Sequence, residues 1–272
     1  MTIRGCAAVA NVECVKLAAQ LKARAALAVC AAGPFAFAAA MRVQSSLPED
    51  TLFGRSVKES GFAVPLVVLG FAAPWVFPLL ASVVGGDVFS AEDRYGTWKM
   101  LLTRSRSRSE VFAGKVVTAL AFSLLAIGVL AVSSMAAGVL LVGSQPLVNL
   151  SGVLLDPAQA TTRIALAWAS ILLPSLGLTA TAVLLSIGTR SSVAGIGVPV
   201  VASLAMQLAA LVDGPEAIRR LMIMSAFGAW HGLLAEPPYY GPLIRGTAVS
   251  AAYFAICLAT AYRLLLRRDI AG

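Results

Sequence analysis

Charged side chains are scarce in this chain of 272 residues. Asp, Glu, Lys and Arg make up only 12% of it, whereas 59% is hydrophobic and the mean hydropathy is +0.86. Soluble domains carry about twice that share of charge and are about 45–50% apolar. The composition therefore excludes an ordinary soluble domain. It predicts an all-α integral membrane protein, with residues 1–272 forming a single transmembrane domain.

The side chains that usually carry chemistry are also few. His231 is the only histidine, so the sequence cannot build a histidine cluster for zinc or copper. The four cysteines are scattered singly, which gives no disulfide framework. Gly114-Lys115 lacks the upstream glycine and the following hydroxyl of a phosphate-binding loop. We therefore expect no catalytic residue, metal or cofactor site in this chain, which makes it not an enzyme by itself.

Six apolar runs are long enough to predict membrane spans. No Asp, Glu, Lys or Arg lies near the centre of any run, which weakens a proton- or ion-coupled carrier as an interpretation. The expected spans cover residues 25–41, 64–84, 116–142, 164–187, 193–212 and 247–266.

The positive charges are distributed unevenly between the two sides of these spans. Of the 21 lysines and arginines, 14 fall in the N-terminal segment, residues 87–115, the turn at Arg190 and the C-terminal tail. Cytoplasmic loops carry such an excess, so we expect both termini in the cytoplasm of a bacterial cell. The net charge of +8 lies at the ends of apolar runs, where lipid head groups account for it better than nucleic acid does.

Two segments outside the spans are apolar on part of their surface. Residues 2–24 predict an amphipathic surface helix whose polar stripe contains Glu13, Lys16 and Gln20. The alternative is a solvated lead-in to the first span. Residues 213–246 predict a re-entrant or interfacial hairpin on the outer side, with Ala226 and Trp230 at the membrane surface. The alternative there is an irregular loop.

Residues 87–115 form the one long charged segment between two strongly apolar ones. A helix with Tyr95, Trp98, Leu101 and Leu102 on one face is expected in it, because these residues recur at helical spacing. Such a helix docks on a partner or lies at the bilayer surface, and Trp98 is its largest anchor. The arginine-serine run at 104–108 fits either direct partner contact or simple anchoring at the membrane surface.

The same segment resembles the signature A-E-x-x-x-G-T-x-x-x-L-L, then S-R, then G-K, of ABC-2 type permeases. These are the membrane subunits of ATP-binding cassette exporters. The arginine-serine run departs from the family, which more often has proline or a small apolar residue there. The matching residues are Ala91-Glu92, Gly96-Thr97, Leu101-Leu102, Arg108 and Gly114-Lys115.

The resemblance implies that residues 96–102 are a coupling helix resting on a separate cytoplasmic ATPase, which binds ATP and Mg. Two permease chains, alike or different, would enclose the substrate path. The residues assigned to ATPase coupling are Glu92, Tyr95, Gly96, Thr97, Trp98, Leu101, Leu102 and Arg108.

The function expected from this resemblance is export of a drug, a lipid or a peptide-like substrate across the cytoplasmic membrane. One alternative is a membrane protein that anchors or regulates an ATPase without transporting anything. The other alternative is a lipid-modifying membrane enzyme.

Overall fold

The computed structural model describes residues 2–44, 52–98, 107–210, 212 and 215–268. Six helical segments in it are long and apolar enough to cross a membrane. They are α2 (Leu21–Val43), α3 (Ala63–Gly85), α6 (Arg108–Leu141), α7 (Pro157–Ser170) continued by α8 (Leu172–Thr189), α9 (Ser192–Ala210) and α11 (Gly241–Arg267). The protein is thus a multi-pass membrane protein built from helices, as the apolar runs predict.

The remaining elements are short or lie outside the spans. The only strands in the described residues are β1 (Leu147–Val148) and β2 (Leu154–Leu155), which pair antiparallel with Leu147 opposite Leu155. The others are α1 (Ile3–Ala19), the 3-10 helix η1 (Arg55–Lys58), α4 (Ser90–Tyr95), α10 (Glu216–Leu221) and the 3-10 helix η2 (Ile223–Leu234).

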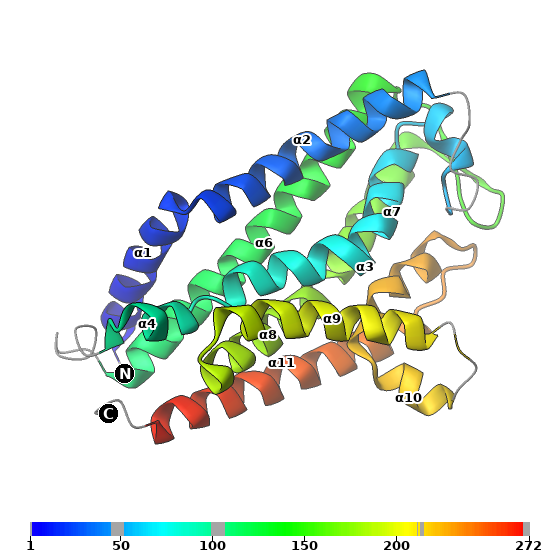
Figure 1. Cartoon of the computed structure of the whole chain (residues 1–272). Helices are drawn as coiled ribbons and strands as arrows, with labels where there is room; N and C mark the ends of the chain where they lie inside the picture. Colours follow the sequence, from blue (N-terminus) through cyan, green and yellow to red (C-terminus); the bar gives the residue numbers. More distant parts are fainter. Residues whose placement is uncertain (1, 45–51, 99–106, 211, 213–214, 269–272) are drawn as a thin grey trace.

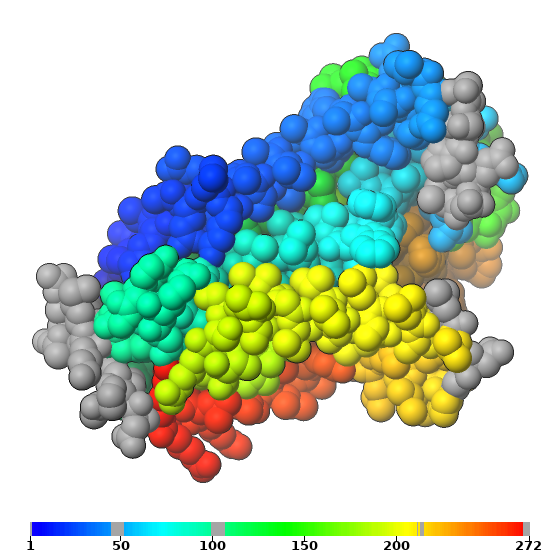
Figure 2. Space-filling model, viewed as in Figure 1, coloured from blue at the N-terminus to red at the C-terminus, as the bar shows by residue number. Residues whose placement is uncertain are grey.

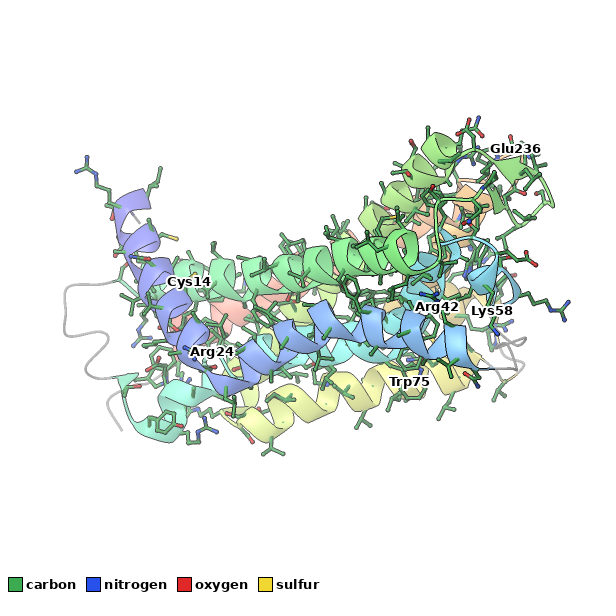
Figure 3. The ribbon with its side chains drawn as sticks, turned by 90° about the horizontal axis from the view of Figure 1, so that it is seen from above. Cys14, Arg24, Arg42, Lys58, Trp75 and Glu236 are labelled. Carbon is green, nitrogen blue, oxygen red and sulfur yellow. The ribbon has the colours of Figure 1, made fainter. Side chains whose placement is uncertain are left out.

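The helices form an elongated bundle with two distinct ends. Both chain termini and α4 lie at one end, which we call the N/C end (Figure 1). Cys14 and Arg24 lie towards this end, whereas Arg42, Lys58 and Glu236 lie towards the other, which we call the opposite end (Figure 3). The side chains that the charge count assigns to different membrane faces are therefore well separated along the bundle.

Helix α6 is the element against which the N-terminal half packs. It contacts α1, α2 and α3, while α8 packs along α11 and also contacts α3 and α9. In Figure 2, α9 covers part of the visible face beside α3, and α2 runs along one edge of the molecule. The second half of the chain thus packs around α8.

Small and hydroxyl-bearing residues line the contacts between these helices. Between α6 and α8, the hydroxyls of Ser123 and Thr179 are 2.8 Å apart, and Ser133 donates to the Cys30 carbonyl of α2 at 2.7 Å. Inside the bilayer the hydrophobic effect does not drive helices together, because lipid tails are as apolar as the side chains. Close backbone approach and such hydrogen bonds hold membrane helices together instead. Alanines with no more than 1% of their surface exposed occur throughout these contacts: Ala63, Ala72, Ala119, Ala126, Ala137, Ala167 and Ala180.

The N-terminal surface helix ends earlier than the sequence predicts. Helix α1 stops at Ala19 because Gln20 has extended backbone (ψ 129°), and α2 begins at once at Leu21. The polar stripe also does not simply face solvent, since Glu13 is only 7% exposed. Residues 2–24 are thus helical over most of their length, as predicted, but the helix is interrupted at Gln20, inside its polar stripe.

The segment between α9 and α11 is more deeply buried than expected. Trp230 is 1% exposed, Ala226 and Phe227 are 2% exposed, and η2 packs against α11, α7, α8 and α3. Phe77 of α3 stacks on Phe227 with ring centroids 6.0 Å apart. Residues 223–234 are too short to count among the candidate spans, as expected of a segment that does not cross, and their helical backbone makes the irregular-loop alternative wrong. Ala226 and Trp230 are covered by other helices of the bundle, and their place at the outer surface stays a prediction. Helix packing, which hydropathy does not report, brings this apolar segment into the bundle.

Candidate functional site

Helix α4 ends at Gly96, which lies inside the docking helix predicted from the sequence. Gly96 has a left-handed backbone (φ +64°), its N–H donates to the Asp93 carbonyl, and the Thr97 N–H donates to the Glu92 carbonyl. This pair of bonds is the Schellman motif that closes helices at glycine. Tyr95 and Trp98 therefore do not share one continuous helix face, contrary to the prediction. Leu101 and Leu102, the other two members of that face, lie outside the described residues.

Trp98 packs inside its own chain. It is 6% exposed, it stacks on Phe89 with centroids 6.3 Å apart, and the Arg268 guanidinium lies 5.2 Å from its ring centre. Tyr95, by contrast, is 70% exposed. The expectation that Trp98 is the free anchor for a partner is therefore wrong for this structure, because intrachain packing covers it. Tyr95 is the aromatic side chain of this segment that faces outward.

Arg108 also makes its contacts within the chain. Its guanidinium donates to the carbonyls of Leu265, Leu266 and Arg268 at 3.3, 2.9 and 2.7 Å. The last carbonyls of a helix lack intrahelical partners, and a cation there also complements the helix dipole. Arg108 thus joins the start of α6 to the end of α11, and it holds the C-terminal tail at the N/C end.

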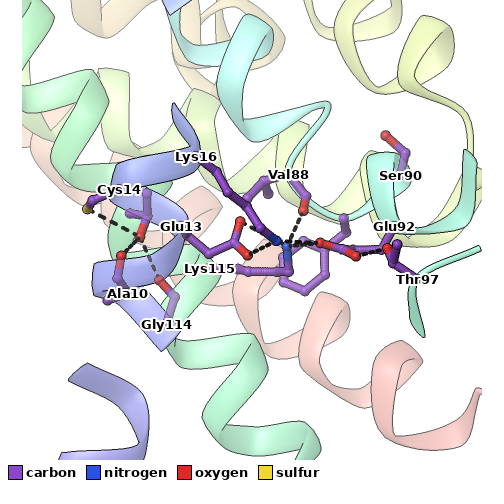
Figure 4. Close-up of polar contacts among 12 residues, drawn as sticks. Ala10, Glu13, Cys14, Lys16, Val88, Ser90, Glu92, Thr97, Gly114 and Lys115 are labelled. Carbon is purple, nitrogen blue, oxygen red and sulfur yellow. Dashed lines mark hydrogen bonds and ion pairs between the residues drawn. The ribbon is translucent and has the colours of Figure 1, made fainter. Parts of the chain in front are cut away.

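Beside α4, charged side chains from three segments meet at a single buried lysine. Lys115 is 1% exposed, and its ammonium lies 2.8 Å from Glu92 Oε1, 3.0 Å from Glu13 Oε2 and 3.0 Å from the Val88 carbonyl oxygen (Figure 4). Three N–H donors thus meet three acceptors. A buried charge is tolerated when it is paired and hydrogen-bonded in this way.

Lys16 and Thr97 complete what we call the Lys115 cluster: Glu13, Lys16, Glu92, Thr97 and Lys115. The Lys16 ammonium lies 2.9 Å from Glu13 and 3.4 Å from Glu92, and the Thr97 hydroxyl donates to the second Glu92 oxygen. The cluster connects α1, α4 and α6 and includes the residue that follows Gly96. It fixes the C-terminal end of α4 against two other helices.

Electrostatics keep Glu92 and Lys16 charged. Burial raises the pKa of Glu92, but the charge and hydrogen bond of Lys115, the Thr97 hydroxyl and the charge of Lys16 outweigh it and bring the pKa to about 2. Burial lowers the pKa of Lys16, but Glu13 and Glu92 together raise it above its ordinary value. Both groups are therefore ionised at neutral pH.

A second group of charges lies at the end of α3. Lys22 of α2 is paired with Asp87, and the Arg94 guanidinium lies 3.6 Å from the other Asp87 oxygen. Burial raises the pKa of Asp87, but hydrogen bonds from Lys22 and Ser192 and the charges of Lys22 and Arg94 lower it overall. Asp93 is paired with Arg268 of the C-terminal tail. The N/C end is thus fastened by ion pairs between distant parts of the chain.

A cavity of about 990 Å³ lies between α1, the end of α3, α4 and α6. Charged residues line part of it, namely Glu13, Lys16, Lys22, Asp87, Glu92 and Lys115. The rest of its wall includes Val9, Val12, Leu17, Val84 and Val88. Among the residues that the structure describes, no group of three or more His, Cys, Asp or Glu side chains has metal-binding geometry. The arrangement can hold an amphipathic molecule or a protein segment.

Gly114 allows α1 to reach this position. A Cβ atom there would lie 2.6 Å from Val9 Cγ1 and 3.0 Å from the Ala10 nitrogen, so a side chain would push α1 away. Gly114-Lys115 thus has two roles, since the glycine admits α1 and the lysine binds Glu13. From the sequence, this pair was identified only as the end of the permease-like motif and as an incomplete phosphate-binding loop. Glu13 was missed as its partner because about 100 residues separate them.

One of two comparisons with known proteins identifies a family. A family model described as "Protein of unknown function (DUF2705)" matches residues 41–271, from the end of α2 to the C-terminal tail. No curated protein matches the chain. The match includes Glu92, Gly96, Thr97 and Lys115 and leaves out Glu13 and Lys16 of α1. Because the matched range includes most of the chain, this protein belongs to the DUF2705 family.

Proposed function

We propose that this protein is the permease subunit of an ATP-binding cassette exporter, and that a separate ATPase binds at its N/C end. The observation that carries the proposal is the physical connection among four residues of the quoted motif. Glu92 binds Lys115 and Thr97, and Gly96 closes α4 beside them. These four residues, spread over 24 positions of sequence, are connected in space.

The geometry of α4 supports a docking role for its exposed end. Tyr95 is 70% exposed immediately before the left-handed Gly96, while Glu92, one turn earlier, is held by two lysines. Interface anchors are typically aromatic side chains presented on a rigid support. A force applied at Tyr95 therefore reaches α6 and α1 through Glu92 and Lys115.

The energy source in this proposal is external to the chain. The sequence has no phosphate-binding loop, so ATP and Mg would bind to the partner ATPase. A second permease chain, identical or homologous, would complete the substrate path. The proposed cargo is a drug, a lipid or a peptide-like molecule that crosses the membrane.

The docking role is tested by comparing two exposed tyrosines at the two ends of the bundle. The wild-type chain, Tyr95→Ala and Tyr240→Ala are each purified from the native membrane, and retained ATP-binding cassette ATPase is measured. Loss of an interface aromatic costs about 2 kcal/mol, roughly a thirtyfold loss in affinity, so Tyr95→Ala should deplete the ATPase. Tyr240, 53% exposed at the start of α11, is the matched control and should leave retention unchanged.

The same preparations separate the alternative functions. Absence of any such ATPase from the wild-type preparation, or equal retention by both variants, would contradict the docking proposal. Retention of the ATPase without ATP-dependent movement of cargo into liposomes would favour an anchor or regulator. Covalent change of membrane lipid by the purified chain alone would favour a lipid-modifying enzyme.

A further inference from the structure

We propose that the cavity between α1, α4 and α6 binds a phospholipid whose head group carries a hydrogen-bond donor, such as phosphatidylethanolamine or phosphatidylglycerol. This inference does not depend on transport or on an ATPase. It rests on the walls of the cavity, on two half-exposed ammonium groups and on one unpaired amide oxygen.

The walls suit an amphiphile better than a small polar solute. Five aliphatic side chains from α1, α3 and the turn that follows α3 line the cavity beside its charged residues: Val9, Val12, Leu17, Val84 and Val88. Its volume of about 990 Å³ is at the upper end of the range for ligand sites, about 300–1,000 Å³. In a protein with six membrane spans, phospholipid is the amphiphile that surrounds every helix.

Two lysines at the cavity can receive a phosphate. The side chains of Lys16 and Lys22 are 46% and 36% exposed, whereas that of Lys115 is 1% exposed. Within the described residues, Lys16 donates to two carboxylates and Lys22 to one, although each ammonium has three N–H donors. The carboxylates they bind are nearly buried, with side chains 7–8% exposed. The outer surface of the charged patch is therefore formed by ammonium groups.

The unpaired side-chain oxygen of Gln20 indicates that the ligand carries a hydrogen-bond donor. Gln20 lines the cavity at the break between α1 and α2, and its Oε1 atom is buried with no hydrogen-bond partner among the described residues. A buried acceptor without a donor is costly. The ammonium of ethanolamine or the hydroxyls of glycerol would donate to this oxygen while the adjacent phosphate binds the lysines. Phosphatidylcholine offers the phosphate but no such donor.

The test measures lipid retention by the purified full-length chain after delipidation in detergent. Native mass spectrometry would count adducts of phosphatidylethanolamine, phosphatidylglycerol and phosphatidylcholine with the same acyl chains. Wild-type protein should retain the first two at about tenfold lower concentration than the third, as loss of one hydrogen bond to a buried group predicts. Gln20→Leu should remove this preference without changing the charge of the cavity.

Further variants separate the phosphate contact from the apolar wall. Lys16→Gln with Lys22→Gln should weaken binding of all three lipids by about tenfold or more, because charge-assisted contacts to phosphate are lost. Lys58→Gln, which removes an exposed lysine near the opposite end, is the charge-matched control and should leave binding unchanged. Val12→Trp fills the cavity from a 55% exposed position without breaking an ion pair, and it should weaken all three lipids as well.

Several results would overturn the proposal. Equal retention of phosphatidylcholine by the wild type, or equal effects of Lys58→Gln and the double lysine variant, would remove the evidence for this site. Equal affinity for deacylated glycerophosphoethanolamine would assign the cavity to a soluble phosphodiester instead. None of these results affects ATPase retention, so the proposed function is tested separately.

Discussion

The two ends of the bundle are stabilised by different interactions. At the N/C end, ion pairs join segments that are far apart in sequence: Glu13–Lys115, Glu92–Lys115, Lys22–Asp87 and Asp93–Arg268. Away from that end, Phe77 stacks on Phe227 and lies edge-on to Trp168 at 6.1 Å, although aromatic pairs such as Phe89–Trp98 also occur at the N/C end. The Arg163–Glu236 ion pair at the opposite end involves a glutamate that is 45% exposed.

This difference determines how each end responds to change. Apolar packing is spread over many atoms and does not depend on pH, so no single side chain controls the opposite end. The N/C end concentrates its interactions on a few buried charges, and Lys115 alone connects α1, α4 and α6. A change in one charge there alters the contacts of three helices, which is a property expected of a region that responds to a partner or a ligand.

The largest contrast between the ends is their accessibility from the two sides of the membrane. Cys14 is exposed at the N/C end, Cys6 is half-buried, and Cys30 and Cys257 are buried. If the N/C end is cytoplasmic, a membrane-impermeant thiol reagent should leave the wild-type chain unlabelled in intact cells. Lys58→Cys, placed towards the opposite end, should be labelled under the same conditions. Permeabilised cells are the control, in which Cys14 should react, and labelling of the wild type in intact cells would invert the orientation.

Replacing the central lysine should have the next largest effect. Lys115→Met leaves the buried carboxylates of Glu13 and Glu92 with Lys16 as their remaining described ammonium partner. Breaking a buried ion pair by removing one partner costs about 3–5 kcal/mol, so we expect a large loss of thermal stability in detergent. Tryptophan fluorescence during heating provides the measurement.

The matched change at the opposite end is Arg163→Met. Its partner Glu236 is 45% exposed, so the loss of that ion pair should cost about 0–1 kcal/mol. The hydrogen bond from Arg163 to the Leu233 carbonyl is lost as well, but the total loss should stay below that of Lys115→Met, because no buried carboxylate is left without its partner. Adding Glu13→Gln and Glu92→Gln to Lys115→Met should restore part of the lost stability, because the uncompensated charges disappear. Equal losses for Lys115→Met and Arg163→Met would show that the two ends do not differ in this way.

A smaller effect is expected from neutralising one glutamate at each end. Glu92→Gln keeps the volume of the side chain but loses the charge that binds Lys115 and Lys16, which should cost about 1.5–3 kcal/mol. Glu236→Gln at the opposite end should cost less than about 1 kcal/mol. The free energy of unfolding, measured for the wild type and both variants at several pH values, tests whether the two glutamates differ in this way.

The pH dependence follows from the depressed pKa of Glu92. Because the folded-state pKa of about 2 is below the ordinary value of 4.5, ionised Glu92 stabilises the fold fully above about pH 4.5. That contribution decreases as the pH falls towards about 2. The stability difference between the wild type and Glu92→Gln should thus be constant from pH 8 to pH 5 and shrink below pH 4.5. A difference that already shrinks between pH 7 and pH 5 would contradict the ionised cluster.

The spans could be predicted from the sequence because each is a continuous apolar run. Their ends could not, since packing decides them. Helix α6 begins at Arg108, eight residues before the expected start, because Glu110 and Lys115 are accommodated by partners that hydropathy does not register. Glu110, for example, accepts hydrogen bonds from Thr2, which lies 108 residues earlier in the sequence.

The candidate site could be predicted only in part. The motif identified Glu92, Gly96 and Lys115, but the helical spacing of Tyr95 and Trp98 concealed the end of α4. Glycine is a common helix stop, so Gly96 itself was the available signal. Nothing in the local sequence pairs Glu13 with Lys115, because that contact depends on how α1 crosses α6. Burial of Trp98 likewise depends on Phe89 and the distant Arg268.

The long-range contacts of α1 have a consequence for biosynthesis. This helix is made well before the residues that hold it: Glu110, Gly114 and Lys115 follow Thr2 and Gly5 by more than 100 positions. At about 5–20 residues per second, synthesis of that interval takes on the order of 5–20 s. During that time the membrane already receives α2 and α3 while Glu13 has no Lys115 to pair with. Docking of α1 is therefore a late step of assembly, although its residues are translated before those of α2, α3 and α6.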